Sequence, residues 1–280
     1  MISRRALLGT TASGLLMPGV ASAIGFNGTT RPGTPSINWN HPACKNLAFS
    51  FIQGGGVATT GAVFDNVKKQ KGAATGTTVG GVLPWMGNIV TLASTNHYNF
   101  TTRPLVVEQV ATFWVVIQVT SLAACDLFFT SSAGNSGILL QMAASGALIL
   151  GLGGVSSTTS TVLLSAAVPY LIIVSKSWAV STFLSKRLDT NAVATQVTTS
   201  GTPTASTGTY LLGASSGANN VCAASFAAFS YANIFTPLSD MIKLAADPWG
   251  PWRGANPLPT EEMVAGAAAA TGSGRLISVP

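Results

Sequence analysis

At residues 113–117 the sequence reads Phe-Trp-Val-Val-Ile, and at residues 171–174 it reads Leu-Ile-Ile-Val. A strand with one exposed face alternates apolar and polar residues, because successive side chains point to opposite faces of the sheet. These two runs are apolar on both faces. They predict central strands that a second sheet covers on one side and that loops or a partner cover on the other.

Similar short apolar runs recur along the middle of the chain, separated by clusters of Gly, Ser, Thr and Asn. The expected strands are residues 47–52, 88–92, 112–119, 126–130, 137–142, 147–152, 170–175, 182–188, 194–199, 209–213 and 222–233. Many short strands with almost no helix between them predict an all-β fold built from antiparallel sheets.

One segment near the C-terminus has helical spacing. Pro237 suits the first helical position, Thr236 offers an N-cap hydroxyl, and Asp240 favours the positive end of the helix dipole. Apolar residues follow at 238, 241, 242 and 245, and Pro248 ends the run. The pattern predicts one short helix over residues 237–246.

The composition indicates a folded chain with little surface charge. Of 280 residues, 47% are hydrophobic and 8% are charged, which is the opposite of the balance in disordered chains. The net charge is +6, but Lys68, Lys69 and Lys71 form the only basic cluster beyond the N-terminus, and we interpret them as a solvated loop. We expect no nucleic-acid partner, because such binding needs a basic stripe, usually with aromatic side chains that stack on bases.

The first 23 residues contain the parts of an export signal. Arg4 and Arg5 precede an apolar stretch, and residues 21–23 offer a small-x-small cleavage site after Ala23. The Ser-Arg-Arg-x-Leu-Leu pattern at residues 3–8 resembles the twin-arginine export motif. Because the apolar run is too short to cross a bilayer, we expect no stable membrane span and a soluble mature protein. The alternative is that residues 1–23 are retained as a docking arm within a larger assembly such as a virus particle.

The rest of the chain is expected to form one domain with two extensions. Residues 24–46 are rich in Gly and Pro and predict an extended lead-in, residues 47–253 hold the sandwich, and residues 254–280 form a tail poor in bulky apolar residues.

The chain has three cysteines, Cys44, Cys125 and Cys222, so at most one intrachain disulfide can form. We interpret them as small buried hydrophobic residues. The sequence leaves open whether any two of them are bonded, and they do not decide the compartment.

Two stretches bracket the expected sandwich. The first is Ile37-Asn38-Trp39-Asn40-His41-Pro42, followed by residues 46–49 and three glycines at 54–56. The second is residues 226–233, followed by the expected helix and Asp247-Pro248-Trp249. Together they resemble the concanavalin A-like, laminin-G-like (LamG) jelly-roll proteins common in phage and prophage genomes. The resemblance implies an antiparallel jelly-roll β-sandwich. It also suggests that Trp39, Trp249 and Trp252 are packing residues that cover the sandwich edge.

Members of this group bind glycans, act as spacers on particles or cleave polysaccharides, and the fold alone does not choose among these functions. Glycosidase members carry alternating carboxylates on one strand, because retaining hydrolysis needs an acid and a nucleophile about 5–5.5 Å apart. Here the carboxylates are scattered over Asp65, Glu108, Asp126, Asp189, Asp240, Asp247, Glu261 and Glu262. We therefore expect no catalytic residue, no metal site and no cofactor.

Two further stretches match catalytic or metal-binding patterns only weakly. Asp189 with Asn191 in a turn is the best candidate for a remnant calcium site. Residues 213–217 fit the Gly-x-Ser-x-Gly nucleophile pattern, but no helix is expected after them and both histidines lie upstream, so we interpret them as a turn.

The remaining candidate for ligand binding is the polar stretch Asn96-His97-Tyr98, which we expect to line a loop, since an aromatic face with amide hydrogen bonds suits a sugar. We expect a non-enzymatic phage virion surface protein that contacts other virion proteins or copies of itself, with host-cell glycans as a further partner. The alternatives are a twin-arginine-exported bacterial surface lectin, located in the periplasm or at the cell surface, and a polysaccharide-cleaving enzyme.

Overall fold

The computed structural model describes residue 31 and residues 36–53, 62–93, 95–100, 109–130, 137–153, 157–203, 209–214 and 220–254. The signal-like segment 1–23 and all but the first residue of the tail 254–280 lie outside these residues. No helix within the described ranges combines the length and apolar character needed to cross a bilayer.

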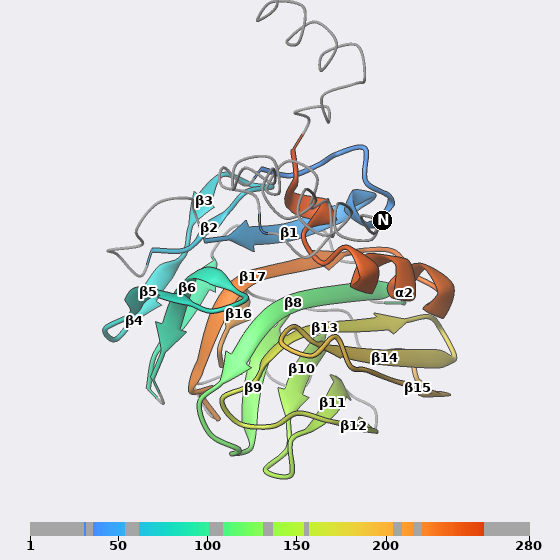
Figure 1. Ribbon diagram of the computed structural model, residues 1–280. Coiled ribbons are helices and arrows are strands. Elements are labelled where there is room, and N and C mark those ends of the chain that lie inside the picture. The colour runs from blue at the N-terminus through green and yellow to red at the C-terminus, as the bar shows by residue number, and fades with distance from the viewer. Residues whose placement is uncertain are drawn as a thin grey trace, which may run out of the picture.

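Two antiparallel sheets face each other and form a sandwich (Figure 1). The eight-stranded sheet runs, in spatial order, β15 (Val193–Thr199), β14 (Val180–Arg187), β13 (Pro169–Lys176), β8 (Ala111–Val119), β17 (Ala224–Ala232), β6 (Gly87–Leu92) and β5 (Val79–Leu83), with β1 (Leu47–Ile52) also paired to β17. The seven-stranded sheet runs β12 (Thr158–Leu163), β11 (Ala147–Leu152), β10 (Ile138–Met142), β9 (Cys125–Phe129), β16 (Tyr210–Leu212), β7 (His97–Phe100) and β4 (Ala73–Thr75). A small hairpin of β2 (Phe64–Asp65) and β3 (Gln70–Lys71) lies beside β1. The predicted all-β sandwich with one short helix is confirmed.

All eleven expected strands are present, with ends shifted by a few residues at most. The hairpin β2–β3 and the strands β4, β5, β7 and β12 were not predicted from the sequence. These strands are rich in Gly, Ala, Thr or polar residues, so their apolar signal is weak.

The main core lies between the two sheets and is dominated by aromatic rings. Phe128 stacks on Phe229 with ring centroids 4.4 Å apart, and Phe49, Phe113 and Tyr210 pack around this pair. All five side chains are buried. Strands from both sheets thus contribute rings to one cluster, which fixes the sheets face to face.

A second apolar cluster covers the outer face of the eight-stranded sheet. It joins Trp114 of β8 and Ile173 of β13 to Met241 of the helix α2 (Leu238–Ala246) and to Trp249 and Trp252. In Figure 1, α2 lies against this sheet on the side away from β9 to β12. Loops and a helix therefore cover the second apolar face of β8 and β13, as the two doubly apolar runs predicted.

The helix begins one residue later than predicted, because Thr236 serves the sheet and not the helix. Its N–H donates to Ser175 Oγ at 2.8 Å and its hydroxyl lies 3.0 Å from Thr112 Oγ1. Pro237 is the N-cap and makes no side-chain capping bond. Thr236 therefore fastens the entry of α2 to β8 and β13.

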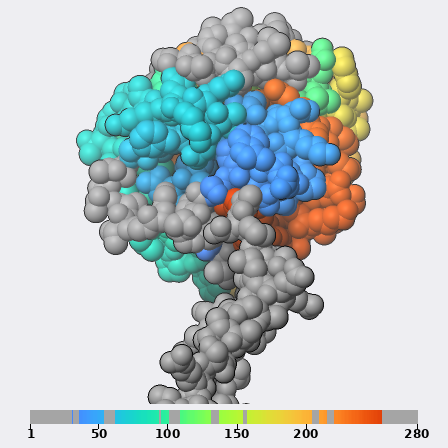
Figure 2. Space-filling model, turned by 90° about the horizontal axis from the view of Figure 1, so that it is seen from above, coloured from blue at the N-terminus to red at the C-terminus, as the bar shows by residue number. Residues whose placement is uncertain are grey.

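The beginning and end of the described chain close over the same face. Ser36 pairs with Arg253 in a parallel bridge, and Ser36 N–H and Asn38 N–H donate to the carbonyls of Trp252 and Pro251 at 3.0 and 2.8 Å. Figure 2 shows the blue N-terminal and orange C-terminal residues side by side there. Residues 36–46 are thus more than the extended lead-in that we expected, since they contain the 3-10 helix η1 (Pro42–Cys44) and bury Ala43 and Cys44.

The three bracketing tryptophans do not share one role. Trp249 and Trp252 are buried, and Trp252 Nε1–H donates to Ser50 Oγ at 3.1 Å. Their predicted packing role is confirmed. Trp39 is 60% exposed, so the prediction that it packs at the edge was wrong. Its segment is fixed by backbone bonds, which leave its side chain facing solvent.

Candidate functional site

The strand β4, at one edge of the seven-stranded sheet, borders a groove of about 450 Å³, which we call the β4 groove. Its lining residues are Ala62, Lys71, Gly72, Ala73, Ala74, Thr78 and Tyr98. Three alanine methyl groups, the hydroxyl-bearing residues Thr78 and Tyr98, and the ammonium group of Lys71 thus surround a space large enough for a small ligand.

Local packing explains why small residues line this groove. A Cβ atom at Gly72 would lie 2.8 Å from Phe100 Cζ and 3.2 Å from Tyr98 Cδ1. Only glycine therefore fits where the backbone passes over these two rings. The next residues, Ala73 and Ala74, pair with Asn99 and Tyr98 of β7 and are exposed. Because β4 ends the strand order of its sheet, its outer backbone groups have no strand partner among the described residues.

The structure places Asn96, His97 and Tyr98 together at the start of β7, and not in a polar loop as expected. All three are buried. Burial also lowers the pKa of His97 below its ordinary value, so its neutral form is favoured. Of the three residues, Tyr98 borders the β4 groove, at its base and without exposed area.

Asn96 has a clear structural task next to the groove. Gly76 adopts φ +78° after β4, and a Cβ there would collide with Asn96 Oδ1. The Asn96 amide group donates to the carbonyl of Thr77, and its Oδ1 accepts from Thr95 Oγ1 at 3.0 Å. Asn96 therefore holds the turn that carries Thr78 into the groove.

The charge at the groove comes from the hairpin β2–β3. Lys71 is exposed in β3, and Lys68 and Lys69 lie in the preceding turn, as the solvated-loop interpretation predicted. Asp65 is buried under this turn, where its Oδ1 accepts from the N–H groups of Ser50 and Val67 at 3.2 and 2.9 Å. Burial raises the Asp65 pKa, although these hydrogen bonds and Lys68 oppose the shift.

A second cavity of about 350 Å³ lies between η1 and the start of α2. Its polar side chains include His41, Lys45 and Lys243, and Lys243 is paired with Asp240 at 2.8 Å. Its apolar wall includes Phe235 and Leu244. This cavity lies over the outer face of the eight-stranded sheet, away from the residues that the sequence analysis proposed.

The wall residue His41 caps η1 through a ring nitrogen that can bind a proton. His41 Nδ1 accepts from Ala43 N–H at 3.1 Å and caps η1, which only the neutral ring can do. Burial lowers the His41 pKa, with Asp247 opposing the shift. The unfolded chain then binds the proton at higher pH than the folded chain, so stability is lost as pH falls below about 6.5.

We expect His41→Asn, which keeps an acceptor that cannot be protonated, to reduce this acid loss. Between pH 7 and pH 5 the melting temperature of the unchanged protein should fall by about 3 °C more than that of His41→Asn, since a helix cap contributes about 1 kcal/mol. Thermal unfolding followed by circular dichroism measures both slopes. Equal slopes would show that His41 does not titrate as described.

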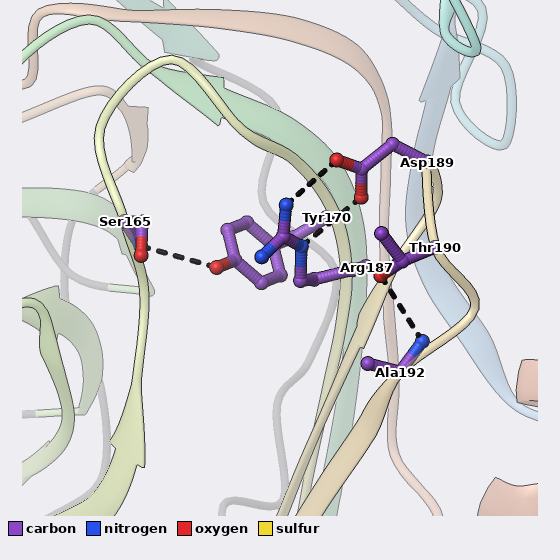
Figure 3. Close-up of polar contacts among 6 residues, drawn as sticks. All are labelled: Ser165, Tyr170, Arg187, Asp189, Thr190 and Ala192. Atoms are coloured by element: carbon purple, nitrogen blue, oxygen red, sulfur yellow. Dashed lines mark hydrogen bonds and ion pairs between the residues drawn. The ribbon is translucent and has the colours of Figure 1, made fainter.

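The turn that we considered as a remnant calcium site holds an ion pair within the protein. Arg187 Nη2 lies 2.7 Å from Asp189 Oδ2, and its Nε lies 3.1 Å from Oδ1 (Figure 3). Arg187 thereby lowers the Asp189 pKa. With both carboxylate oxygens bound to one guanidinium group, Asp189 is not arranged as a calcium ligand.

The other carboxylates in the described ranges also have protein partners. Asp126 accepts from Gln141 Nε2, Asp240 pairs with Lys243, and Asp247 pairs with Arg253 at 2.7 Å. The described residues contain no group of three or more His, Cys, Asp or Glu that could hold a metal ion. Glu108, Glu261, Glu262 and the serines of the nucleophile-like turn lie outside them.

Exposed aromatic residues at two hairpin turns were missed by the sequence analysis. Trp85 lies between β5 and β6 and is 61% exposed, and Trp178 lies between β13 and β14 and is 58% exposed. Trp85 also has φ +65°, a conformation that bulky residues rarely adopt. The sequence Pro84-Trp85-Met86-Gly87 could have indicated an exposed tryptophan, since Pro and Gly predict a turn and Trp85 lies between them.

Comparison with known proteins shows the fold. No protein-family model matches the chain, and no curated protein matches its sequence. Among solved structures, the chain is similar to the binding domain of botulinum neurotoxin DC in complex with SialylT, with 10% identity and a TM-score of 0.52 over 71% of this chain and 51% of that one. It is similar to the botulinum neurotoxin type G receptor binding domain, with 6% identity and a TM-score of 0.51 over 71% and 51%.

A third similar structure is domain 4 of AbnA, a GH43 extracellular arabinanase from Geobacillus stearothermophilus, in complex with arabinotriose. It has 11% identity and a TM-score of 0.50, and the match covers 71% of this chain and 98% of that domain. The chain therefore spans about half the length of the neurotoxin chains and nearly all of the arabinanase domain. At these identities the likeness establishes a shared β-sandwich fold.

Proposed function

We propose that this chain is a non-enzymatic surface module that binds glycans through the β4 groove. The main support is the mixture of small apolar and polar residues that line this groove. Alanine methyl groups suit the C–H faces of a sugar ring, while Lys71 and the outer edge of β4, which has no strand partner among the described residues, offer hydrogen-bond partners for hydroxyl groups. Two structures of the same fold are described with ligands, SialylT in one and arabinotriose in the other, which supports the choice of ligand class.

We further propose that the module acts on the surface of a phage particle, attached to other virion proteins or to copies of itself. The resemblance of residues 37–49 and 226–249 to jelly-roll proteins of phage and prophage genomes supports this location. The exported bacterial lectin is the second candidate, which the twin-arginine-like pattern at residues 3–8 favours. Mass spectrometry of the native protein separates the two, because an N-terminus at Ile24 would support export and remove the docking-arm proposal.

The glycan proposal is tested by blocking the groove. We expect the full chain to bind at least one member of a glycan array, and Ala74→Trp to weaken that binding by about tenfold or more, since the indole would fill the groove. Lys71→Ala should weaken it by about tenfold through loss of a charge-assisted hydrogen bond. Biolayer interferometry with the best array ligand gives the dissociation constants.

Val193→Trp is the matched control, because Val193 is an exposed residue of β15, at an edge of the other sheet. It should leave affinity unchanged, and all variants should keep the melting temperature of the unchanged chain. Equal affinities for Ala74→Trp and Val193→Trp would exclude the β4 groove as the binding site. An array without any bound glycan would contradict the proposed function.

A further inference from the structure

Two of the three cysteines lie together in the main core. Cys125 begins β9 in the seven-stranded sheet, and Cys222 lies just before β17 of the eight-stranded sheet. Their Sγ atoms are 2.8 Å apart although the residues are 97 positions apart in sequence. A disulfide bond is about 2.05 Å long, so joining the two sulfur atoms requires only a small movement.

The backbone around this pair holds both residues in place without any bond between the sulfur atoms. Asp126 and Val221, the direct neighbours of the two cysteines, form a parallel bridge, and Asp126 N–H donates to the carbonyl of Asn220 at 2.8 Å. Cys222 N–H donates to the carbonyl of Gly213 at 2.9 Å. The fold therefore brings these two thiols together before any oxidation.

Cys44 is held elsewhere. It belongs to η1, on the outer face of the eight-stranded sheet, and its thiol donates to the carbonyl of Pro251 at 3.5 Å. Cys125 and Cys222 belong to the core on the inner face of that sheet. The sheet thus separates Cys44 from the pair, and the folded chain offers it no partner among the described cysteines.

We propose that Cys125 and Cys222 form an intrachain disulfide when the chain folds in the presence of a small-molecule disulfide such as oxidised glutathione, and that Cys44 stays a thiol. One cysteine thiolate attacks the glutathione disulfide and releases the first glutathione. The second cysteine then displaces the other glutathione from the mixed disulfide. Two cysteines are oxidised, one glutathione disulfide is reduced, and the two cysteine protons end on two glutathione thiols.

The reaction belongs to folding and not to the finished fold. Both cysteines are buried, and the hydrogen bond with Cys125 together with burial raises the Cys222 pKa, which suppresses the reactive thiolate. A partly folded chain exposes the thiols to the oxidant. A bond between residues 97 positions apart then stabilises the folded state, because it restricts the unfolded chain. We therefore expect the oxidised protein to melt about 10 °C above the reduced protein.

The experiment refolds the reduced, denatured full chain in a mixture of reduced and oxidised glutathione. Free thiols are then alkylated in denaturant, and the protein is digested without reduction for mass spectrometry. We expect a linked peptide pair containing Cys125 and Cys222, together with alkylated Cys44. Cys44→Ser should keep the linked pair, and Cys125→Ser should leave Cys222 alkylated.

If Cys125→Ser fails to fold, peptide mapping of the unchanged chain and of Cys44→Ser still decides the matter. Three alkylated cysteines in refolded protein with native circular dichroism would overturn the proposal. A bond that includes Cys44 would overturn it as well. The outcome does not depend on glycan binding, so it is independent of the proposed function.

Discussion

Phe128→Ala is expected to lower the free energy of unfolding by about 4 kcal/mol, the usual range for removing a buried ring from a packed core. Phe128 has no exposed area, and its ring contacts Phe113 and Phe229 of the opposite sheet and Tyr210 of its own sheet. Removing it leaves a cavity that the surrounding strands cannot close, because their registers are fixed by ladder hydrogen bonds. Urea unfolding followed by intrinsic fluorescence measures the change.

Phe64→Ala is the matched control for this substitution. Phe64 belongs to β2 and is 51% exposed, so its loss should change the free energy of unfolding by no more than about 0.5 kcal/mol. If both variants lost the same amount of stability, the aromatic cluster would not be the core that joins the two sheets.

Trp252→Ala is expected to lower the free energy of unfolding by about 3–5 kcal/mol. It should also weaken the contacts between the two ends of the sandwich, residues 36–38 and 251–253. Trp252 is buried between Trp114 and Trp249, with ring centroids 6.4 and 5.9 Å away. Its loss also leaves Ser50 Oγ without the indole donor, next to Ser230 Oγ at 2.7 Å. Hydrogen exchange should therefore rise in β1 more than in β10 or β11.

The control for Trp252 is Trp39→Ala, which removes the same side chain from an exposed position in the same closing region. We expect it to leave unfolding and exchange in β1 nearly unchanged. Trp252→Phe separates the contribution of the hydrogen bond from that of ring packing, since it keeps a ring but loses the indole donor. It should lower the free energy of unfolding by about 1 kcal/mol through loss of the bond, with a further loss because the ring is smaller. A Trp39→Ala variant as unstable as Trp252→Ala would contradict this assignment.

The strands that pack on both faces could be predicted because burial on both sides leaves a continuous apolar run, as in β8 and β13. The strand β7 was missed although Tyr98 and Phe100 alternate with His97 and Asn99, because its polar residues were interpreted as a loop. The strand β4 could not be recognised from Ala73, Ala74 and Thr75. Its place at the sheet edge comes from pairing with β7, which is a tertiary property.

The candidate site was predictable only in part for the same reason. The sequence directs attention to Tyr98, but the groove depends on Gly72 and on two alanines that carry no chemical signal by themselves. The proximity of Cys125 and Cys222 depends on the pairing of distant strands, which a count of three cysteines does not reveal. At Asp189 the sequence suggested a ligand site that the structure does not form. Its carboxylate and a nearby amide side chain resembled a calcium-binding turn, but Arg187 binds both carboxylate oxygens.

The bridge between Ser36 and Arg253 determines how this module can be tethered. Because the two ends of the sandwich meet at one corner, a carrier joined through either flank would hold the body at the same point. The orientation presented to the surroundings would then be the same for an N-terminal or a C-terminal anchor.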